Sequence, residues 1–373
     1  MNYRTFPKTG KKVSLLGFGT MRLPEVDGHI DEAEAIRMIR YAIDNGVNYV
    51  DTAYMYHDGA SEVLVGKALK DGYREKVLLA DKLHLLFAEE AADQQKILDE
   101  QLRRLDLPSI DMYLVHDIHE KLWERAKKYD TLRFMREKQA EGVIKHVGFS
   151  FHGETPAFFR EIVDAFPWDF CQIQLNYMDT EFQAGVEGLK YAESKGIPVI
   201  VMEPLKGGKL TDVLPGPIQA YWDNIGTDRT PADWALKWVA NFPAVLTILS
   251  GMSTFEQVEE NIRILSNAEA NGLTAEELAV IGKVAQEYNN LIPYSCTACK
   301  YCIPCPVKLK IPYIISLRNE ATIYESPEKI AKTVRNLVRP QPSACIACKQ
   351  CEEKCPQHLP ISEIMSESAQ MFE

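Results

Sequence analysis

The sequence lacks the features that would place it in several special classes of protein. No apolar run approaches the roughly 20 residues needed to cross a bilayer, and residues 1–20 show no signal-peptide pattern. Positive charge is in deficit, with a net charge of −11, which argues against a nucleic-acid partner. We therefore expect a cytoplasmic protein of 373 residues that binds neither membrane nor nucleic acid.

Cysteine is also scarce over most of the chain, because Cys171 is the only one of nine that precedes residue 296. We expect this lone cysteine to be a small buried apolar residue. The other eight form two ladders, each followed by proline: Cys296, Cys299, Cys302 and Cys305, and then Cys345, Cys348, Cys351 and Cys355. Because cytosolic thiols stay reduced, these cysteines are better explained as metal ligands than as disulfides.

The spacing within the ladders distinguishes between metals. Zinc sites usually use two Cys-x-x-Cys pairs that lie far apart, whereas consecutive steps followed by Cys-Pro favour [4Fe–4S] clusters. In two-cluster modules the fourth cysteine of each run ligates the other cluster. The sequence therefore predicts two clusters, one held by Cys296, Cys299, Cys302 and Cys355, and one held by Cys345, Cys348, Cys351 and Cys305.

Residues 14–267 alternate short apolar runs with longer amphipathic stretches. The expected strands are Leu15–Phe18, Tyr49–Val50, Val77–Ala80, Met112–Val115, Val147–Phe149, Phe170–Leu175, Val199–Met202 and Leu246–Leu249. The expected helices are Asp31–Asn45, Ser61–Lys70, Ala88–Leu105, Leu122–Glu141, Pro156–Ala165, Gly185–Lys195, Pro231–Asn241 and Thr254–Asn267. Eight such units predict a closed parallel (β/α)8 TIM barrel. An open doubly wound sheet is the alternative, but no early Gly-x-Gly-x-x-Gly supports it.

The remaining sequence predicts a second domain. A further helix is expected over Thr274–Tyr288, with Thr274 as its cap and Glu277 completing a capping box. Residues 289–295 resemble a linker, and helical stretches near 311–321 and 327–338 separate the two ladders. We expect a barrel over residues 1–288, followed by a small, mainly helical, ferredoxin-like iron–sulfur domain over residues 289–373.

Polar residues stand where the predicted strands end, which is where barrels of this kind carry their chemistry. Asp51, Lys82, His116 and Ser150 end successive strands 31, 34 and 34 residues apart, so we expect them at one level, with Tyr56 close by. An ammonium beside a tyrosine stabilises the tyrosinate and is expected to lower a pKa that is otherwise about 10. The group predicts that Tyr56 donates a proton to a carbonyl oxygen that a neutral His116 positions.

These segments resemble a known family. Residues 48–66 are similar to the signature of the aldo-keto reductases, and residues 79–82 and 110–116 are similar to the segments that carry that family's catalytic lysine and histidine. With the ladders, nearly the whole chain resembles the subgroup fused to a C-terminal ferredoxin-type domain. The resemblance implies an NAD(P)H-dependent oxidoreductase that acts on a carbonyl or an alcohol, with the catalytic tetrad Asp51, Tyr56, Lys82 and His116.

The same resemblance implies where the coenzyme binds. Residues 147–150 and 172–174 are similar to strands that bind the nicotinamide carboxamide, and two later loops, one leading into a helix, are suited to phosphates. The implied contacts are Ser150, Gln172 and Met202 at the nicotinamide, Leu205, Gly207, Gly208, Ser250 and Gly251 at the phosphates, Gln257 near the 2′-phosphate, and Glu260 and Asn261 at the adenine.

The sequence departs from the family at three of these places. Phe151 replaces an asparagine that follows the serine, and Met202 replaces a tyrosine that often stacks on the nicotinamide. Gly251 and Gln257 stand where many members grip the 2′-phosphate of NADP with lysine and arginine. Because a dianionic phosphate binds less tightly without a cation, the family favours NADP(H) while NAD(H) stays open.

Several functions are compatible with the sequence. The leading interpretation is carbonyl reduction or alcohol oxidation; the alternative is electron transfer between nicotinamide and a redox partner through the clusters. A hydride carries two electrons, whereas each cluster normally passes one. Electron transfer from nicotinamide to the clusters therefore requires either a group such as flavin that passes electrons singly or both clusters acting in succession. The sequence shows no sign of a flavin site. Structural clusters and a nicotinamide sensor are further alternatives. Substrate-pocket candidates are Tyr54, His57, Phe151 and His152, each equally explained by packing or loop solvation, and Trp123, which packing explains better.

Overall fold

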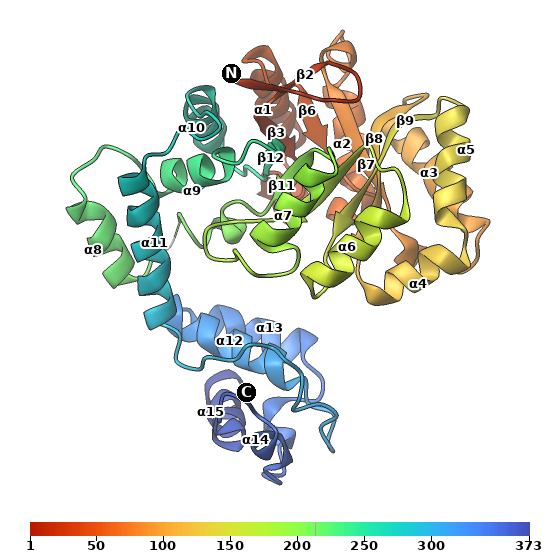
Figure 1. Ribbon diagram of the computed structural model, residues 1–373. Coiled ribbons are helices and arrows are strands. Elements are labelled where there is room, and N and C mark those ends of the chain that lie inside the picture. The colour runs from red at the N-terminus through yellow and green to blue at the C-terminus, as the bar shows by residue number, and fades with distance from the viewer. Residues whose placement is uncertain (213) are drawn as a thin grey trace. The chain divides into compact units, whose positions relative to one another are not determined.

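The computed structural model describes residues 1–212 and 214–373, and its first compact unit is a barrel (Figure 1). Eight parallel strands close in the order β10-β11-β12-β3-β6-β7-β8-β9. Their bounds are β3 (Leu16–Gly19), β6 (Tyr49–Asp51), β7 (Leu78–Leu83), β8 (Ile110–Ile118), β9 (Ile144–Phe151), β10 (Phe170–Gln174), β11 (Val199–Met202) and β12 (Val245–Ser250). All eight predicted strands and the predicted barrel are confirmed, as expected for strands that are apolar on both faces.

Two short hairpins precede the first helix and were not predicted. One pairs β1 (Tyr3–Thr5) with β2 (Lys12–Ser14), and the other pairs β4 (Glu25–Val26) with β5 (His29–Ile30). Phe6 follows β1 and is fully buried in a cluster with Tyr49, Leu78 and Met112. Because Tyr49 and Leu78 begin their strands, the first hairpin closes the amino end of the barrel and leaves the carboxyl ends for the site.

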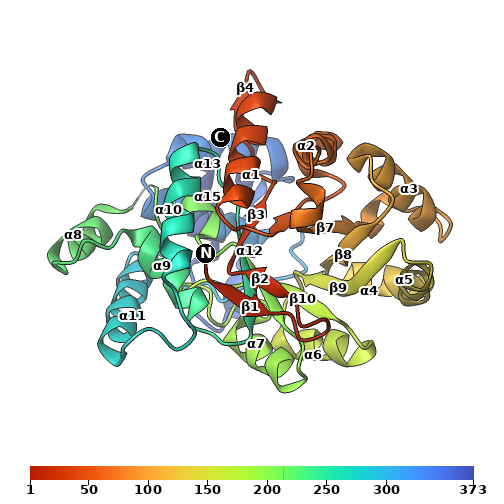
Figure 2. The ribbon, with the colours of Figure 1, turned by 90° about the horizontal axis from the view of Figure 1, so that it is seen from above.

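Helices surround the strands (Figure 2). They are α1 (Glu32–Asp44), α2 (Ala60–Ala68), α3 (Asp93–Leu105), α4 (Glu120–Lys128), α5 (Thr131–Ala140), α6 (Pro156–Ala165), α7 (Gly185–Ser194), α9 (Pro231–Ala240) and α10 (Phe255–Ser266). The expected single helix over residues 122–141 is wrong, because Asp130 between α4 and α5 has a φ of 50° and interrupts the helical backbone.

The predicted helix caps are present. The hydroxyl oxygens of Thr155 and Thr230 accept hydrogen bonds from the third residues of α6 and α9. The capping box is also formed: the Thr274 amide donates to Glu277 over 2.7 Å, and the Glu277 amide donates to the Thr274 hydroxyl over 3.2 Å. The helix that follows, α11 (Ala275–Asn290), extends two residues beyond its expected end.

The first compact unit comprises Met1–Thr211 and Arg229–Leu278, and a second comprises Asp212–Asp228 and Ala279–Glu373. The second is helical, with the end of α11 and with α8 (Gly216–Asn224), α12 (Ile311–Ile323), α13 (Pro327–Leu337), α14 (Gln350–Glu353) and α15 (Ile361–Phe372), of which α8, α14 and α15 were not predicted. It has its own apolar core, in which Ile314, Val334, Ile364 and Phe372 are fully buried.

Short 3-10 helices complete the connections. They are η1 (Tyr56–Gly59), η2 (Arg74–Lys76), η3 (Leu85–Phe87), η4 (Lys206–Gly208) and η5 (Pro342–Ala344). Within the described residues, no helix is both long enough and apolar enough to span a membrane.

Candidate active site

A buried ion pair lies at the carboxyl ends of β6 and β7. The Lys82 ammonium donates to Asp51 Oδ1 over 2.6 Å and to the Thr52 carbonyl oxygen over 2.6 Å, and the Lys82 side chain is fully buried. The two residues do not lie at one level, as expected from the sequence, because Asp51 pairs in register with Ala80. The strand stagger of the barrel places Lys82 two residues further along, and its long side chain spans the difference.

Tyr56 begins η1, five residues after the end of β6, and faces the same ammonium. Its hydroxyl lies 3.5 Å from Lys82 Nζ, and Lys82 Nζ lies 4.9 Å from the centre of its ring. The Tyr56 ring approaches the His116 ring edge-on, with the ring centres 6.3 Å apart. The structure therefore brings Asp51, Tyr56, Lys82 and His116 together around one hydroxyl.

The electrostatics of Tyr56 differ from the expectation. Burial raises the pKa of Tyr56 above 10.0; the Lys82 charge lowers it only in part, and the Asp51 charge raises it further. The prediction that Lys82 lowers the Tyr56 pKa below its ordinary value is therefore wrong for the protein without coenzyme or substrate. The tyrosine is a proton donor at neutral pH, and the lysine limits how weak an acid it becomes.

The charge on Lys82 is secured by its partners. Burial lowers the pKa of Lys82, but the attraction of Asp51 and Tyr56 outweighs burial and raises it overall. An ammonium taken out of water is tolerated only where a close opposite charge and further hydrogen bonds compensate for the lost hydration. Asp51 and the Thr52 carbonyl supply both.

His116 enters the site through an irregularity in β8. The register between β8 and β9 shifts between Val115 and Ile118, where Asp117 has a φ of 54°, and such bulges redirect side chains. Burial, with the positive charge of Lys82, lowers the pKa of His116 well below 6.5. The imidazole is therefore neutral at physiological pH and can donate or accept a hydrogen bond.

His84 is a site residue that the sequence reasoning missed. Its ring centre lies 4.7 Å from that of His116, and its Nδ1 accepts the Leu86 amide over 3.3 Å. Burial lowers the pKa of His84 also. The available signal was its position two residues after Lys82, because residues two apart in an extended segment share a face.

The five substrate-pocket candidates separate into two groups. Phe151 is fully buried against Phe158 and Phe159, and Trp123 is buried with its indole nitrogen 3.0 Å from Glu161, so both belong to the packed layer rather than to a pocket. The others remain partly exposed: Tyr54 contacts Phe87 with ring centres 5.3 Å apart, His152 lies 3.3 Å from Gln183, and His57 lies 3.0 Å from Glu25.

The expected nicotinamide contacts are adjacent in the sheet. Ser150 pairs in register with Gln172, whose amide nitrogen lies 3.3 Å from the Met202 sulfur. The Gln172 Oε1 atom is buried and has no hydrogen-bond partner among the described residues. The Ser150 hydroxyl oxygen accepts the Asp117 amide over 2.9 Å and retains its own proton to donate. An orphaned buried acceptor beside a free hydroxyl donor fits the amide group of a nicotinamide.

The two loops expected at the phosphates also have suitable backbone. Leu205 leads into η4, where Gly207 and Gly208 have φ values of 68° and 90°. Gly251 precedes the amino end of α10, which Thr254 caps. Ser250 ends β12, and its hydroxyl oxygen accepts a hydrogen bond from Asn261 over 3.0 Å. Backbone amides at a helix start and at glycine turns bind anions, so the chain fits the phosphates.

The residues expected near the adenine and the 2′-phosphate are held within α10. The Gln257 side-chain oxygen accepts a hydrogen bond from the Ser253 amide over 2.8 Å. This contact holds the loop in place, and the neutral side chain offers no positive charge to a phosphate. Glu260 accepts the Thr230 hydroxyl over 2.8 Å, and Asn261 is buried. The contacts of Gln257, Glu260 and Asn261 with the adenosine end of a coenzyme stay a prediction.

Comparison with known proteins agrees with this geometry. A model of the aldo/keto reductase family matches residues 15–220, which is more than half of the chain. The chain belongs to the aldo/keto reductase family. It is therefore an oxidoreductase that uses NAD(P)H. Near the C-terminus, a model of the 4Fe-4S dicluster domain matches residues 295–359.

Individual relatives cover most of this reductase. L-galactose dehydrogenase of Arabidopsis thaliana is 28% identical over 311 residues, which span 77% of this chain and 95% of the relative. NADH-specific methylglyoxal reductase of Escherichia coli (strain K12) is 27% identical over 304 residues, 68% and 90% of the two chains. An aldo-keto reductase from Klebsiella pneumoniae in complex with NADPH superposes with a TM-score of 0.62 at 27% identity, covering 76% of this chain and 96% of that one.

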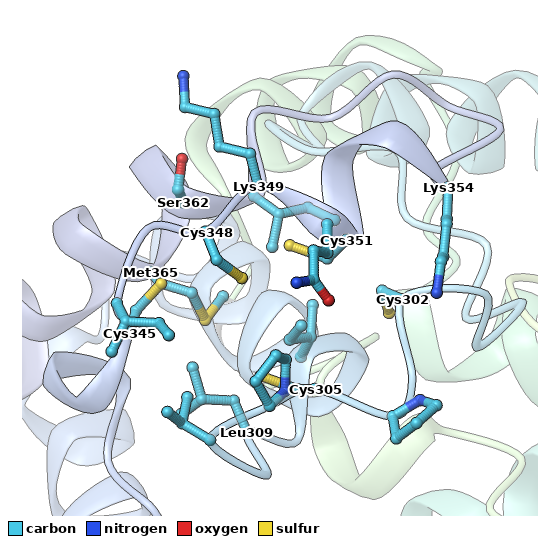
Figure 3. Close-up of a pocket in the computed structure, with 17 residues that line it drawn as sticks. Cys302, Cys305, Leu309, Cys345, Cys348, Lys349, Cys351, Lys354, Ser362 and Met365 are labelled. Atoms are coloured by element: carbon cyan, nitrogen blue, oxygen red, sulfur yellow. The ribbon is translucent and has the colours of Figure 1, made fainter.

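The cysteine ladders of this reductase line two cavities within the second unit. One cavity is lined by Cys296, Cys299, Cys302 and Cys355, which form one of the two predicted ligand sets. The other is lined by the second predicted set, Cys305, Cys345, Cys348 and Cys351, together with Cys302 (Figure 3). Cys305 thus lines a cavity with the second ladder and Cys355 lines one with the first, while their ligation of clusters stays a prediction.

The thiols surround these cavities without converging on a point. Among the described residues, no three His, Cys, Asp or Glu side chains are close enough to hold a single metal ion. A cluster is larger than one ion and its ligands stand further apart, so two groups of four thiols fit two clusters better than two zinc ions. Cys171, in contrast, is fully buried in β10, and burial raises the pKa of its thiol, as expected for an inert apolar residue.

A second group that the sequence reasoning missed lies behind the tetrad. Asp81 and Glu62 are fully buried, and Asp81 Oδ2 and Glu62 Oε1 have no hydrogen-bond partner among the described residues. Burial, with the negative charge of Glu62, raises the pKa of Asp81 well above 3.8. Arg104 binds the other Glu62 oxygen over 2.7 Å. Asp51 therefore remains the carboxylate that pairs with the Lys82 ammonium, over 2.6 Å.

Proposed function

We propose that this aldo/keto reductase reduces a small aldehyde or ketone to an alcohol, or catalyses the reverse reaction, with Tyr56 as the general acid and base. The observation that supports the role is the Tyr56 hydroxyl, which lies 3.5 Å from the buried Lys82 ammonium and next to the neutral His116 ring. The relatives act, by their names, on methylglyoxal and L-galactose, which are small carbonyl or hydroxyl compounds.

The residues divide the work between proton transfer and positioning. When bound, NAD(P)H supplies the hydride. Tyr56 gives its proton to the carbonyl oxygen and takes it back in the reverse direction, while the neutral His116 imidazole donates a hydrogen bond that orients that oxygen. Lys82 stabilises the tyrosinate that remains, and Asp51 fixes Lys82. Each group acts because the site is buried, where charges interact more strongly than in water.

The coenzyme contacts are part of the proposal. Ser150 and Gln172 would bind the carboxamide, Met202 would pack on the ring, and the backbone of Leu205, Gly207, Gly208, Ser250 and Gly251 would bind phosphates, with Gln257, Glu260 and Asn261 at the adenosine end. One relative is named NADH-specific and one structure holds NADPH, so both coenzymes are tested below.

The Tyr56→Phe variant tests the proposed acid. Phenylalanine keeps the ring beside Lys82 and His116 and removes only the transferable proton. We expect carbonyl reduction to fall about 10²- to 10⁴-fold, the usual contribution of general acid catalysis, with coenzyme affinity unchanged. Single-turnover reduction and a coenzyme titration of the same protein measure the two quantities. A loss of less than about threefold would remove Tyr56 from the chemistry.

We also propose that the second unit holds two [4Fe–4S] clusters with crossed ligand sets, which the cysteines lining its two cavities support. In the Cys305→Ala/Cys348→Ala variant both lost ligands belong to one cavity, so iron should fall from about eight to about four atoms per chain. In the Cys305→Ala/Cys299→Ala variant the lost ligands belong to different cavities, so almost all iron should be lost. Uncrossed ladders predict the reverse for the two variants, and Cys171→Ala should keep the full iron content.

An electron-transfer role is supported by the residues that the two cavities share. Cys302 lines both, so clusters held there would be close enough to exchange electrons with one another. We expect anaerobic NAD(P)H to bleach the visible cluster absorbance, with flavin added in a parallel sample to supply a two-electron to one-electron converter. Unchanged absorbance in both samples, during undiminished carbonyl reduction, would instead assign the clusters a structural role.

A further inference from the structure

Arg22 follows β3, at the carboxyl ends of the barrel strands, and no carboxylate is paired with its guanidinium in the part of the chain that the structure describes. The side chain is exposed, while its carbonyl oxygen accepts a hydrogen bond from the Ser253 hydroxyl over 2.9 Å. The main chain of Arg22 is thus tied to the loop that precedes α10. Other arginines without an acidic partner, such as Arg4 and Arg125, donate to main-chain carbonyl oxygens, whereas the Arg22 guanidinium makes no hydrogen bond to the described residues.

The side chain extends across both loops that are expected to hold phosphates. A Cβ atom built on Gly251 would lie 3.3 Å from Cβ, Cγ and Cδ of Arg22, so the arginine stem occupies the space that a larger residue at 251 would need. A Cβ atom built on Gly207 would lie 3.0 Å from a terminal guanidinium nitrogen. The charged end therefore reaches the η4 loop.

The surroundings concentrate positive potential there. The helix α10, of 12 residues, begins four residues after Gly251, and its amino end carries the positive end of the helix dipole. Lys206, the neighbouring cation of η4, is already neutralised by Asp179 at 2.5 Å. Glu256 lies in the first turn of α10, so the Arg22 guanidinium is the cation here without an acidic partner, and its fork matches phosphate geometry.

We propose that Arg22 binds a phosphate group of the coenzyme and supplies, from the loop after β3, the cation that residues 251 and 257 do not provide. The glycine at 251 is then not a lost contact but the space through which Arg22 reaches the phosphate. This inference rests on the proposed coenzyme site. The phosphate is either the 2′-phosphate, which only NADP(H) carries, or the pyrophosphate, which both coenzymes carry.

Calorimetric titration of the full-length, cluster-containing protein with NADPH and with NADH tests the proposal. Loss of a charge-assisted arginine–phosphate contact should weaken binding about tenfold or more in Arg22→Ala. Weakening for NADPH alone assigns the 2′-phosphate, and equal weakening for both assigns the pyrophosphate. Arg22→Lys should restore part of the affinity, because it keeps the charge but not the fork. Unchanged affinity for both coenzymes in Arg22→Ala would overturn the proposal.

Two controls separate this inference from the proposed reaction. Lys11→Ala removes an exposed positive charge from the hairpin at the opposite end of the barrel and should leave both affinities unchanged. Tyr56→Phe should bind coenzyme normally and fail to reduce carbonyls. If the wild type binds coenzyme and reduces carbonyls while Arg22→Ala keeps full affinity, only the role of Arg22 falls. If the wild type binds neither coenzyme, both proposals fall.

Discussion

The buried ion pair between Lys82 and Asp51 is the constraint on which the rest of the site depends. An ammonium with no exposed surface is stable only if an opposite charge and further acceptors surround it, and here they come from the end of the neighbouring strand. The closed barrel makes this possible, because it holds β6 and β7 in a fixed stagger. The same surroundings raise the pKa of Tyr56 and lower the pKa of His116. The tyrosine therefore keeps its proton and the histidine stays neutral.

The other parts of the molecule serve this centre or extend it. In the proposed coenzyme site, the orphaned Gln172 oxygen would accept from the carboxamide, the glycine turns of η4 would bind phosphate, and Arg22 would supply a cation that residues 251 and 257 do not. The second unit has its own apolar core, so its clusters need not be staples for a unit that would otherwise lack one; this is consistent with a role in electron transfer.

Much of this could be predicted from the sequence because the signals are local. Strand hydrophobicity, the threonine caps and the spacing of the cysteines each act over a few residues, and each predicted its element. The break at Asp130 depends on a single φ angle, and the pKa of Tyr56 depends on how much burial outweighs the lysine, so neither could be predicted. His84 and Arg22 enter the site through packing between loops that lie far apart in the chain.

The most direct test measures the ionisation of Tyr56 with and without the lysine charge. The tyrosinate absorbance of each protein, less that of its Tyr56→Phe counterpart, isolates this one phenol during an alkaline titration. Because the Lys82 charge stabilises tyrosinate, Lys82→Met should move the Tyr56 pKa upward relative to the wild type, in a protein whose circular dichroism shows it to be folded. An unchanged or lower Tyr56 pKa in Lys82→Met would contradict the account.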